Sequence, residues 1–228
     1  MDPRISIIAC VSELYGTLLN DWWLRFMPGD CRPMLRMFSA GPTSFRQGDW
    51  HKVTEKKIDL ILDHMEKELD GSVFVMSDLD VQFFRPLADD VRSLMQGFDI
   101  LFQNDYGTRQ SPPLERGLGG LNSGFIAIRV GDASRHLFER ARTYMRDKND
   151  PSVDDQAALR VVTADERQAR LGLLPPRYWT HGTYWTPGQA LDPPSDIVTH
   201  HANWIIGNGT KLLQLREVRE IVEGRSRG

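Results

Sequence analysis

Residues 72–87 read SVFVMSDLDVQFFRPL, an uninterrupted apolar run followed by two aspartates and a second short apolar run. The run over residues 72–77 has the length and composition of a strand that is buried on both faces. Asp78 and Asp80 come directly after it, at the carboxyl end of the strand, where open α/β sheets bind their ligands. This stretch therefore predicts a central strand with a site at its end.

Strand-like and helix-like segments alternate on both sides of this stretch. Residues 49–69 place apolar side chains at helical spacing and lead into the central strand, so we expect an amphipathic helix there. Further strands are predicted at residues 4–11, 33–38, 99–103, 123–129 and 196–200, and further helices at 137–145, 153–161 and 211–222. The alternation indicates an α/β fold, and since no linker or shift in composition divides the chain, residues 1–228 are interpreted as one domain.

The overall composition argues against several classes of protein. With 228 residues and a formal net charge of −3, the chain can bury a core but offers no large positive field for nucleic acid. No run is long and apolar enough for a membrane span, and the N-terminal residues do not resemble a signal peptide, so we expect a cytoplasmic protein. Cys10 and Cys31 lack the spacing of a zinc site and are interpreted as buried reduced thiols.

The aspartate pair can be explained in two ways. Carboxylates are the ligands that Mg²⁺ and Mn²⁺ prefer, and a bound diphosphate could complete the coordination. Alternatively, Asp78 and Asp80 are turn or cap residues that simply end a buried strand. The spacing alone cannot decide, because Asp-x-Asp is common by chance, and the rest of the chain has to supply the context.

Three later motifs supply that context: GLGGLNSGFIAIR at residues 117–129, SVDDQAALR at 152–160 and HHANWIIGNGTK at 200–211. With the Asp78 region they resemble the nucleotide-diphospho-sugar transferases of GT-A fold, especially the family of the plant cell-wall rhamnogalacturonan xylosyltransferases and, more distantly, the glycogenin-like galactosyltransferases. The resemblance implies a mixed, mostly parallel Rossmann-like sheet flanked by helices. It also implies Mn²⁺ or Mg²⁺ as cofactor and sugar transfer with retention at the anomeric carbon.

The resemblance assigns the metal and diphosphate contacts. Asp80 would bind the metal directly. Asp78 would contact the sugar and the ribose, and its contact with the metal would often be indirect. His201 would be the third ligand rather than His200, because neighbouring side chains of an extended segment point to opposite sides. Lys211 would donate to the diphosphate. On chemistry alone, the histidine pair could merely end a strand and Lys211 could be a solvated helix lysine.

The same resemblance assigns the sugar contacts. Asn122 would bind donor hydroxyls, Asp155 would bind sugar hydroxyls, and Gln156 would lie near the anomeric carbon. Their mechanistic role stays open between a short-lived covalent intermediate and attack from the leaving-group face. The alternative is structural, with Ser152 and Asp154 serving as the N-cap and first-turn acid of a helix.

The nucleotide contacts are expected near the first strand. There Tyr15 would stack on the base and Ser12 would reach its edge, although a tyrosine at this place could equally serve packing. Lys57, or its neighbour Lys56, would contact phosphate from the helix before the central strand, unless both belong to an exposed helical face.

Loops are predicted at residues 39–48, 104–121 and 180–195. Gly119 and Gly120 would permit a close approach of the backbone to the donor or would form a tight turn. Trp179, Tyr184 and Trp185 could form a platform for the acceptor or could anchor the late loop.

By resemblance, the donor is a uridine diphosphate sugar in preference to a guanosine one. The acceptor, whether a glycan, a lipid-linked glycan or a protein, is left open. Two other functions compete with transfer: a metal-dependent phosphohydrolase acting on a diphosphate, and a sugar-nucleotide-binding module without catalysis. Efficient turnover without an acceptor would favour the hydrolase, and binding without turnover would favour the module.

Overall fold

A central six-stranded sheet organises the chain. The computed structural model describes residues 3–12, 15–39, 50–107, 118, 120–148, 150 and 152–225. The strands lie in the order β2-β1-β3-β6-β5-β7, with bounds β1 Ile5–Ser12, β2 Cys31–Phe38, β3 Val73–Ser77, β5 Ile100–Asn104, β6 Leu121–Arg129 and β7 Leu171–Leu173. β1 pairs parallel with β2 and β3, and β5 pairs parallel with β7. Of these strands, β6 alone runs antiparallel to its neighbours, which confirms the predicted mixed, mostly parallel sheet.

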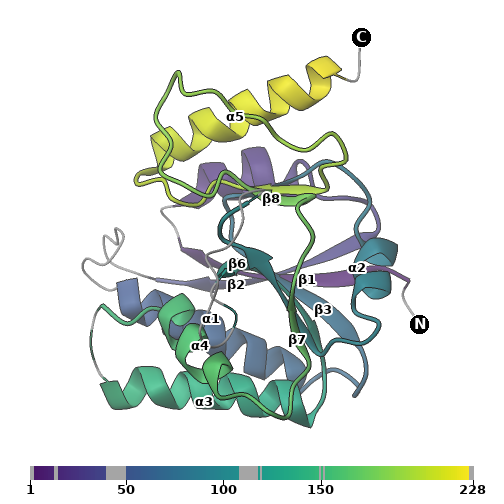
Figure 1. Ribbon diagram of the computed structural model, residues 1–228, viewed down its shortest axis with the longest axis vertical. Helices are drawn as coiled ribbons and strands as arrows, with labels where there is room; N and C mark the ends of the chain where they lie inside the picture. The colour runs from purple at the N-terminus through teal and green to yellow at the C-terminus, as the bar shows by residue number, and fades with distance from the viewer. Residues whose placement is uncertain are drawn as a thin grey trace.

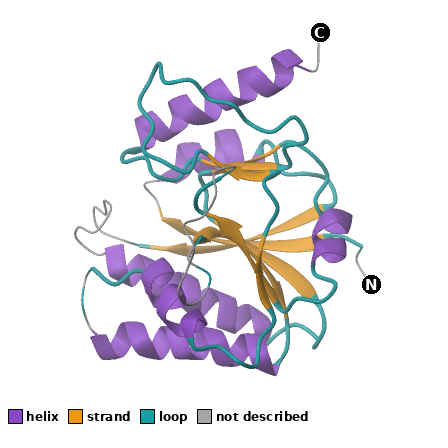
Figure 2. Cartoon of the chain, in the orientation of Figure 1, coloured by secondary structure: helices purple, strands orange, loops and turns teal. Residues whose placement is uncertain are grey.

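A second sheet brings the C-terminal histidines opposite the aspartates. Its strands are β4 Val81–Phe83, β8 Tyr178–Thr180 and β9 Thr199–His201, in the order β4-β9-β8. β4 follows the aspartate turn at once and pairs antiparallel with β9, so that Val81 lies opposite His201 and Gln82 opposite His200. Figure 2 shows the two sheets as separate layers.

Helices cover both faces of the central sheet. Figure 1 shows α1, α3 and α4 grouped on one face, with α5 lying beyond β8 on the other. Their bounds are α1 Trp50–Met65, α3 Asp132–Lys148, α4 Asp155–Ala164 and α5 Asn208–Arg225, and the shorter helices are the π-helix η2 Leu18–Leu24 and α2 Ala88–Leu94.

The apolar run of β3 serves two cores. Phe74 and Met76 pack toward α1 and α3, whereas Val75 packs toward η2 and the second sheet. Because successive side chains of a strand point to opposite faces, a sheet covered on both sides needs apolar residues at every position. This explains why the central strand could be predicted as an unbroken apolar segment.

The structure corrects several predicted boundaries. The helix expected at 49–69 ends at Met65, the helix expected at 137–145 extends over Asp132–Lys148, and the strand expected at 196–200 is observed at Thr199–His201. The loops predicted at 39–48 and 104–121 fall largely outside the described residues. Within the described part of the chain, no helix combines the length and the apolar character that a membrane crossing requires.

Candidate functional site

The turn between β3 and β4 carries the two aspartates. It is fixed from both sides, since Asp78 N donates to Gly124 O at 2.7 Å and Ala202 N donates to Asp80 O at 3.0 Å. Asp78, Asp80 and His201 each offer one ligand atom, and these atoms lie within 4.8 Å of one another. Two carboxylates and an imidazole form a donor set that suits a divalent cation. The structure thus brings together the three residues predicted as metal ligands.

Gln103 fixes the orientation of the His201 ring. Its Nε2 donates to the carbonyls of Tyr178 and Trp179 at 3.2 and 3.3 Å, which leaves Oε1 facing His201 Nδ1 at 2.9 Å. Because an amide oxygen only accepts, His201 Nδ1 carries the proton and Nε2 presents its lone pair. That lone pair lies 3.3 Å from Asp80 Oδ1. Two acceptors that face each other fit a cation bound between them.

Gly124 makes room for this ring. A Cβ atom added to Gly124 would lie 2.1 Å from His201 Cε1, a distance at which one of the two must move. The glycine of the Asn-Ser-Gly motif is therefore required by the close approach of β6 to the imidazole.

His200 lies on the other side of β9, as the alternation of an extended segment predicts. It is fully buried, and its Nδ1 lies 2.9 Å from Gln82 Nε2. Burial, together with the adjacent His201, lowers the pKa of His200 to about 3, so the ring is neutral. Its position separates it from the aspartates.

Lys211, near the start of α5, forms an ion pair with Asp80 Oδ2. Burial by itself would raise the pKa of Asp80, but the ammonium of Lys211 outweighs it and lowers the pKa below the usual range. Tyr15 is close enough to Lys211 to influence its pKa. The ammonium is thus already paired with one of the two aspartates expected to bind the metal.

Lys57 is buried, contrary to the exposed helical face considered for it. Its ammonium contacts Asp155 Oδ2 at 2.7 Å, Asp78 Oδ1 at 3.0 Å and Ser123 O at 3.1 Å. Burial would lower the pKa of Lys57, but the two carboxylates outweigh it and raise the pKa. The three donors of the ammonium therefore face two carboxylates and one carbonyl. Lys57 therefore orients Asp78 and Asp155, and the predicted phosphate contact would require one of these bonds to be exchanged.

Asp105 lies at the centre of the site, although no sequence motif predicts it there. Its buried carboxylate accepts hydrogen bonds at 2.9 to 3.5 Å from five side chains: Asn122, Gln156, Arg160, Asn203 and Trp204. These donors come from β6, α4 and the segment after β9, so one carboxylate joins three parts of the site. The available signal was its position just after the strand predicted at 99–103, the same place that Asp78 occupies after its own strand.

The structural alternative is right that a capping residue precedes the Asp-Gln pair but wrong about which one, because Asp154 and not Ser152 is the N-cap. Asp154 is the N-cap of α4, since its Oδ1 accepts from Ala157 N at 2.8 Å. Asp155 and Gln156 form the first turn and face the site, where Gln156 Oε1 accepts from Ser123 N at 3.2 Å. A capping residue and two site residues therefore follow one another directly.

Comparison with known proteins identifies the family. The sequence pattern of the nucleotide-diphospho-sugar transferases matches residues 23–215. The chain belongs to this family. A search of curated proteins found no significant match to the transferase.

Solved structures show the same fold as the transferase. One is the galactosyltransferase LgtC in complex with donor and acceptor sugar analogs, with a TM-score of 0.56, 10% identity and 96% of each chain covered. Another is a glycosyltransferase involved in the glycosylation of the major capsid of PBCV-1, with a TM-score of 0.60, 11% identity, and 94% of this chain and 100% of that chain covered. The GT-A fold expected from the resemblance is thereby confirmed.

The expected nucleotide end of the transferase lies at the end of β1. Ser12 is buried, and its hydroxyl has no hydrogen-bond partner among the described residues. Tyr15 is half-buried and packs against the core. A buried hydroxyl without a protein partner is suited to a ligand atom. Gly119, which was expected near the donor, lies outside the described residues.

The three aromatic residues expected in the late loop separate into two groups. Trp179 and Trp185 are almost fully buried and belong to the core, so they anchor the loop and cannot form a platform. Tyr184 is 60% exposed. Of the two alternatives, loop anchoring therefore holds for the two tryptophans.

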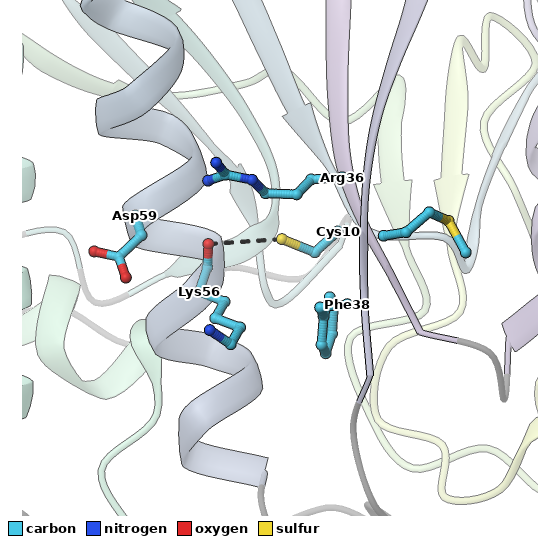
Figure 3. Close-up of a pocket in the computed structure, with 6 residues that line it drawn as sticks. Cys10, Arg36, Phe38, Lys56 and Asp59 are labelled. Atoms are coloured by element: carbon cyan, nitrogen blue, oxygen red, sulfur yellow. Dashed lines mark hydrogen bonds between the residues drawn. The ribbon is translucent and has the colours of Figure 1, made fainter.

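A small cavity between β2 and α1 lies on the helical side of the transferase (Figure 3). Its volume is about 160 Å³, and it is lined by Cys10, Arg36, Met37, Phe38, Lys56 and Asp59. Burial raises the pKa of the Cys10 thiol to about 12, so the thiol is protonated at neutral pH. Cys10 and Cys31 are both free; Cys31 is buried as expected, whereas Cys10 is half-buried.

Proposed function

We propose that this transferase moves a sugar from a nucleotide diphosphate, preferably a uridine diphosphate, to an acceptor hydroxyl with retention at the anomeric carbon. The observation that carries the proposal is the cluster of Asp78, Asp80 and His201, in which His201 presents a lone pair toward Asp80. These residues would hold Mn²⁺ or Mg²⁺. When bound, the cation would neutralise charge on the departing diphosphate.

The residues around the cluster would contact the nucleotide and the sugar of the donor on different sides. Lys211 would exchange part of its contact with Asp80 for a diphosphate oxygen, since an ammonium can donate to several acceptors. Tyr15 and Ser12 would hold the base. This arrangement is supported by the buried Ser12 hydroxyl, which has no hydrogen-bond partner among the described residues.

The sugar would lie between Asp155, Gln156 and Asn122. In the reaction the anomeric carbon loses its bond to the phosphate oxygen and bonds to the acceptor hydroxyl oxygen, while the hydroxyl proton passes to the departing phosphate. Each described aspartate of the site is already paired with a lysine or arginine: Asp78, Asp80, Asp105 and Asp155. This pairing supports attack from the leaving-group face over a carboxylate nucleophile.

A phosphohydrolase is less well supported. Two-metal hydrolysis needs further bridging ligands, whereas the cluster within the described ranges consists of Asp78, Asp80 and His201. The cytoplasmic location stays a prediction.

Thermal unfolding with nucleotides tests the proposal. A ligand that binds only the native state raises the melting temperature, so we expect uridine diphosphate and its sugars to do so with Mn²⁺ and not with chelator. Asp80→Asn removes one ligand charge and should weaken metal-dependent donor binding by about tenfold or more. Exposed Asp89 provides the matched control Asp89→Asn. A donor shift that persists in chelator, or in Asp80→Asn, would show that the cluster does not bind the donor through a metal.

A further inference from the structure

Trp204 is held in an unusual conformation at the surface. Among the described residues it is the one non-glycine residue with a positive φ, 59°, and it is 37% exposed. A bulky side chain rarely adopts this backbone region, so the surroundings must hold it there. Its indole Nε1 donates to Asp105 Oδ1 at 3.1 Å, which fixes one edge of the ring inward and leaves other ring atoms at the surface.

Tyr184 completes an exposed aromatic pair. Its ring centroid lies 5.3 Å from that of Trp204, at an interplanar angle of 76°. The loop that carries Tyr184 is held by two glycines with positive φ: Gly107 approaches Thr180 O, and Gly182 approaches Tyr106 O, each too closely to allow a Cβ atom. The pair is therefore built from two fixed segments.

The aromatic pair borders the sugar end of the site. The carboxylate of Asp105 that binds Trp204 also binds Asn122 and Gln156, which are expected to contact the donor sugar. Trp204 also follows closely after His201 in the chain. The residues expected at the nucleotide end are instead Ser12, Tyr15 and Lys211. The pair is thus connected to the reacting end of the donor.

We propose that Trp204 and Tyr184 form the subsite for an acceptor saccharide. The C–H face of a pyranose ring packs on an aromatic face, and hydroxyls at its edge bond to nearby polar groups. This inference rests on the proposed transfer reaction, because the bound saccharide supplies the hydroxyl that attacks the anomeric carbon. It narrows the acceptor to a molecule with a sugar at the reacting end.

Saccharide binding can be measured separately from nucleotide binding. The probes are the methyl glycosides of glucose, galactose, mannose and fucose, observed by saturation-transfer NMR with uridine diphosphate and Mg²⁺ present. We expect binding to at least one glycoside, about tenfold weaker in Trp204→Ala and Tyr184→Ala, and restored in Tyr184→Phe because the ring remains. Tyr144→Ala, at a half-buried tyrosine of α3, is the matched control. The nucleotide-induced thermal shift should stay unchanged in both alanine variants.

Three results would overturn the subsite. They are no binding of any glycoside by the wild-type protein, full glycoside binding in Tyr184→Ala, or a loss of nucleotide binding in Tyr184→Ala, which would assign the rings to the base. Tyr184→Ala keeps the test valid if Trp204→Ala does not fold, because Tyr184 is largely exposed. Glycoside binding that depends on the rings, without any nucleotide shift in the wild type, would leave a saccharide-binding site but overturn the nucleotide-dependent transfer that makes it an acceptor subsite.

Discussion

The His201 imidazole is positioned by neighbours that contact it on different sides. Gln103 binds Nδ1, Gly124 packs against the ring, and Asp80 lies at Nε2. Each neighbour acts at a single atom or ring, so its contribution can be tested by a single substitution. A partner that fixes the tautomer of a histidine ligand typically changes metal affinity by about tenfold to a hundredfold.

Gln103→Leu should weaken metal binding by about tenfold to a hundredfold, because His201 loses the acceptor that holds its proton on Nδ1. Isothermal titration with Mn²⁺ measures the change. Gln82→Leu is the matched control, since Gln82 is equally buried but contacts His200. Equal losses in both variants would mean that the effect comes from general disturbance of the second sheet.

Gly124→Ala should lower both stability and metal affinity, because the added methyl group displaces the His201 ring. Overpacking of this kind costs about 1 to 3 kcal/mol of unfolding free energy. Urea unfolding and Mn²⁺ titration measure the two effects. The control is Gly131→Ala, at a position where a Cβ atom meets nothing within 4 Å. Normal Mn²⁺ affinity in Gly124→Ala would argue that the ring need not occupy its observed position.

At the scale of elements, Asp105 and Asp99 flank the same strand, β5, and have different environments. Asp105 is buried and accepts bonds from β6, α4 and the segment after β9. Asp99 pairs with Arg170, whose side chain is largely exposed. One carboxylate therefore joins several elements inside the protein, while the other forms a pair near the surface.

Asp105→Asn should lower the free energy of unfolding by about 3 kcal/mol, since the buried amide can no longer accept from all the donors that surround Asp105. Asp99→Asn should cost about 1 kcal/mol or less, because exposed pairs contribute little. Chemical denaturation of both variants gives the comparison. Similar costs for the two variants would refute the joining role of Asp105.

An element can be predicted from the sequence when the pattern that reveals it lies in consecutive residues. The apolar run of β3 and the amphipathic α1 carry their burial pattern in consecutive residues, so both were predicted. Asp80 and His201 could be proposed as ligands because both stand in motifs shared with a known family, and the structure places them together. Gln103 and Asp105 belong to no such motif, and their roles arise from contacts with residues distant in the chain. Short strands such as β7 likewise exist only through pairing.

At the scale of the whole molecule, packing of α1 on the sheet buries a titratable group outside the site. His64 is 4% exposed and meets Phe74 of β3 edge-on, with ring centroids 4.6 Å apart. Burial, helped by Arg32 and Lys67 and opposed by Glu68, lowers the pKa of His64 from 6.5. The stability of the protein is thereby linked to pH.

Stability should fall as pH decreases below about 6.5, because the unfolded chain then binds a proton at His64 more readily than the folded one. Above that pH the imidazole is neutral in both states, and its contribution is fully present. His64→Gln should reduce the slope of unfolding free energy between about pH 6.5 and pH 5. The same change at exposed His136 is the matched control. An equal decrease of the slope in both variants would contradict the assignment of this pH dependence to His64.

The pairing of β9 with β4 has a consequence for biosynthesis. β1, β3, β4 and β6 lie within residues 5–129, whereas His201 and Lys211 come from the last segments of the described chain. During translation the aspartate turn therefore leaves the ribosome long before its histidine and lysine partners. Contacts so distant in sequence form late, because they must wait for the intervening chain. We expect a ribosome-bound chain arrested before Thr199 to have a nearly complete central sheet and no affinity for the nucleotide.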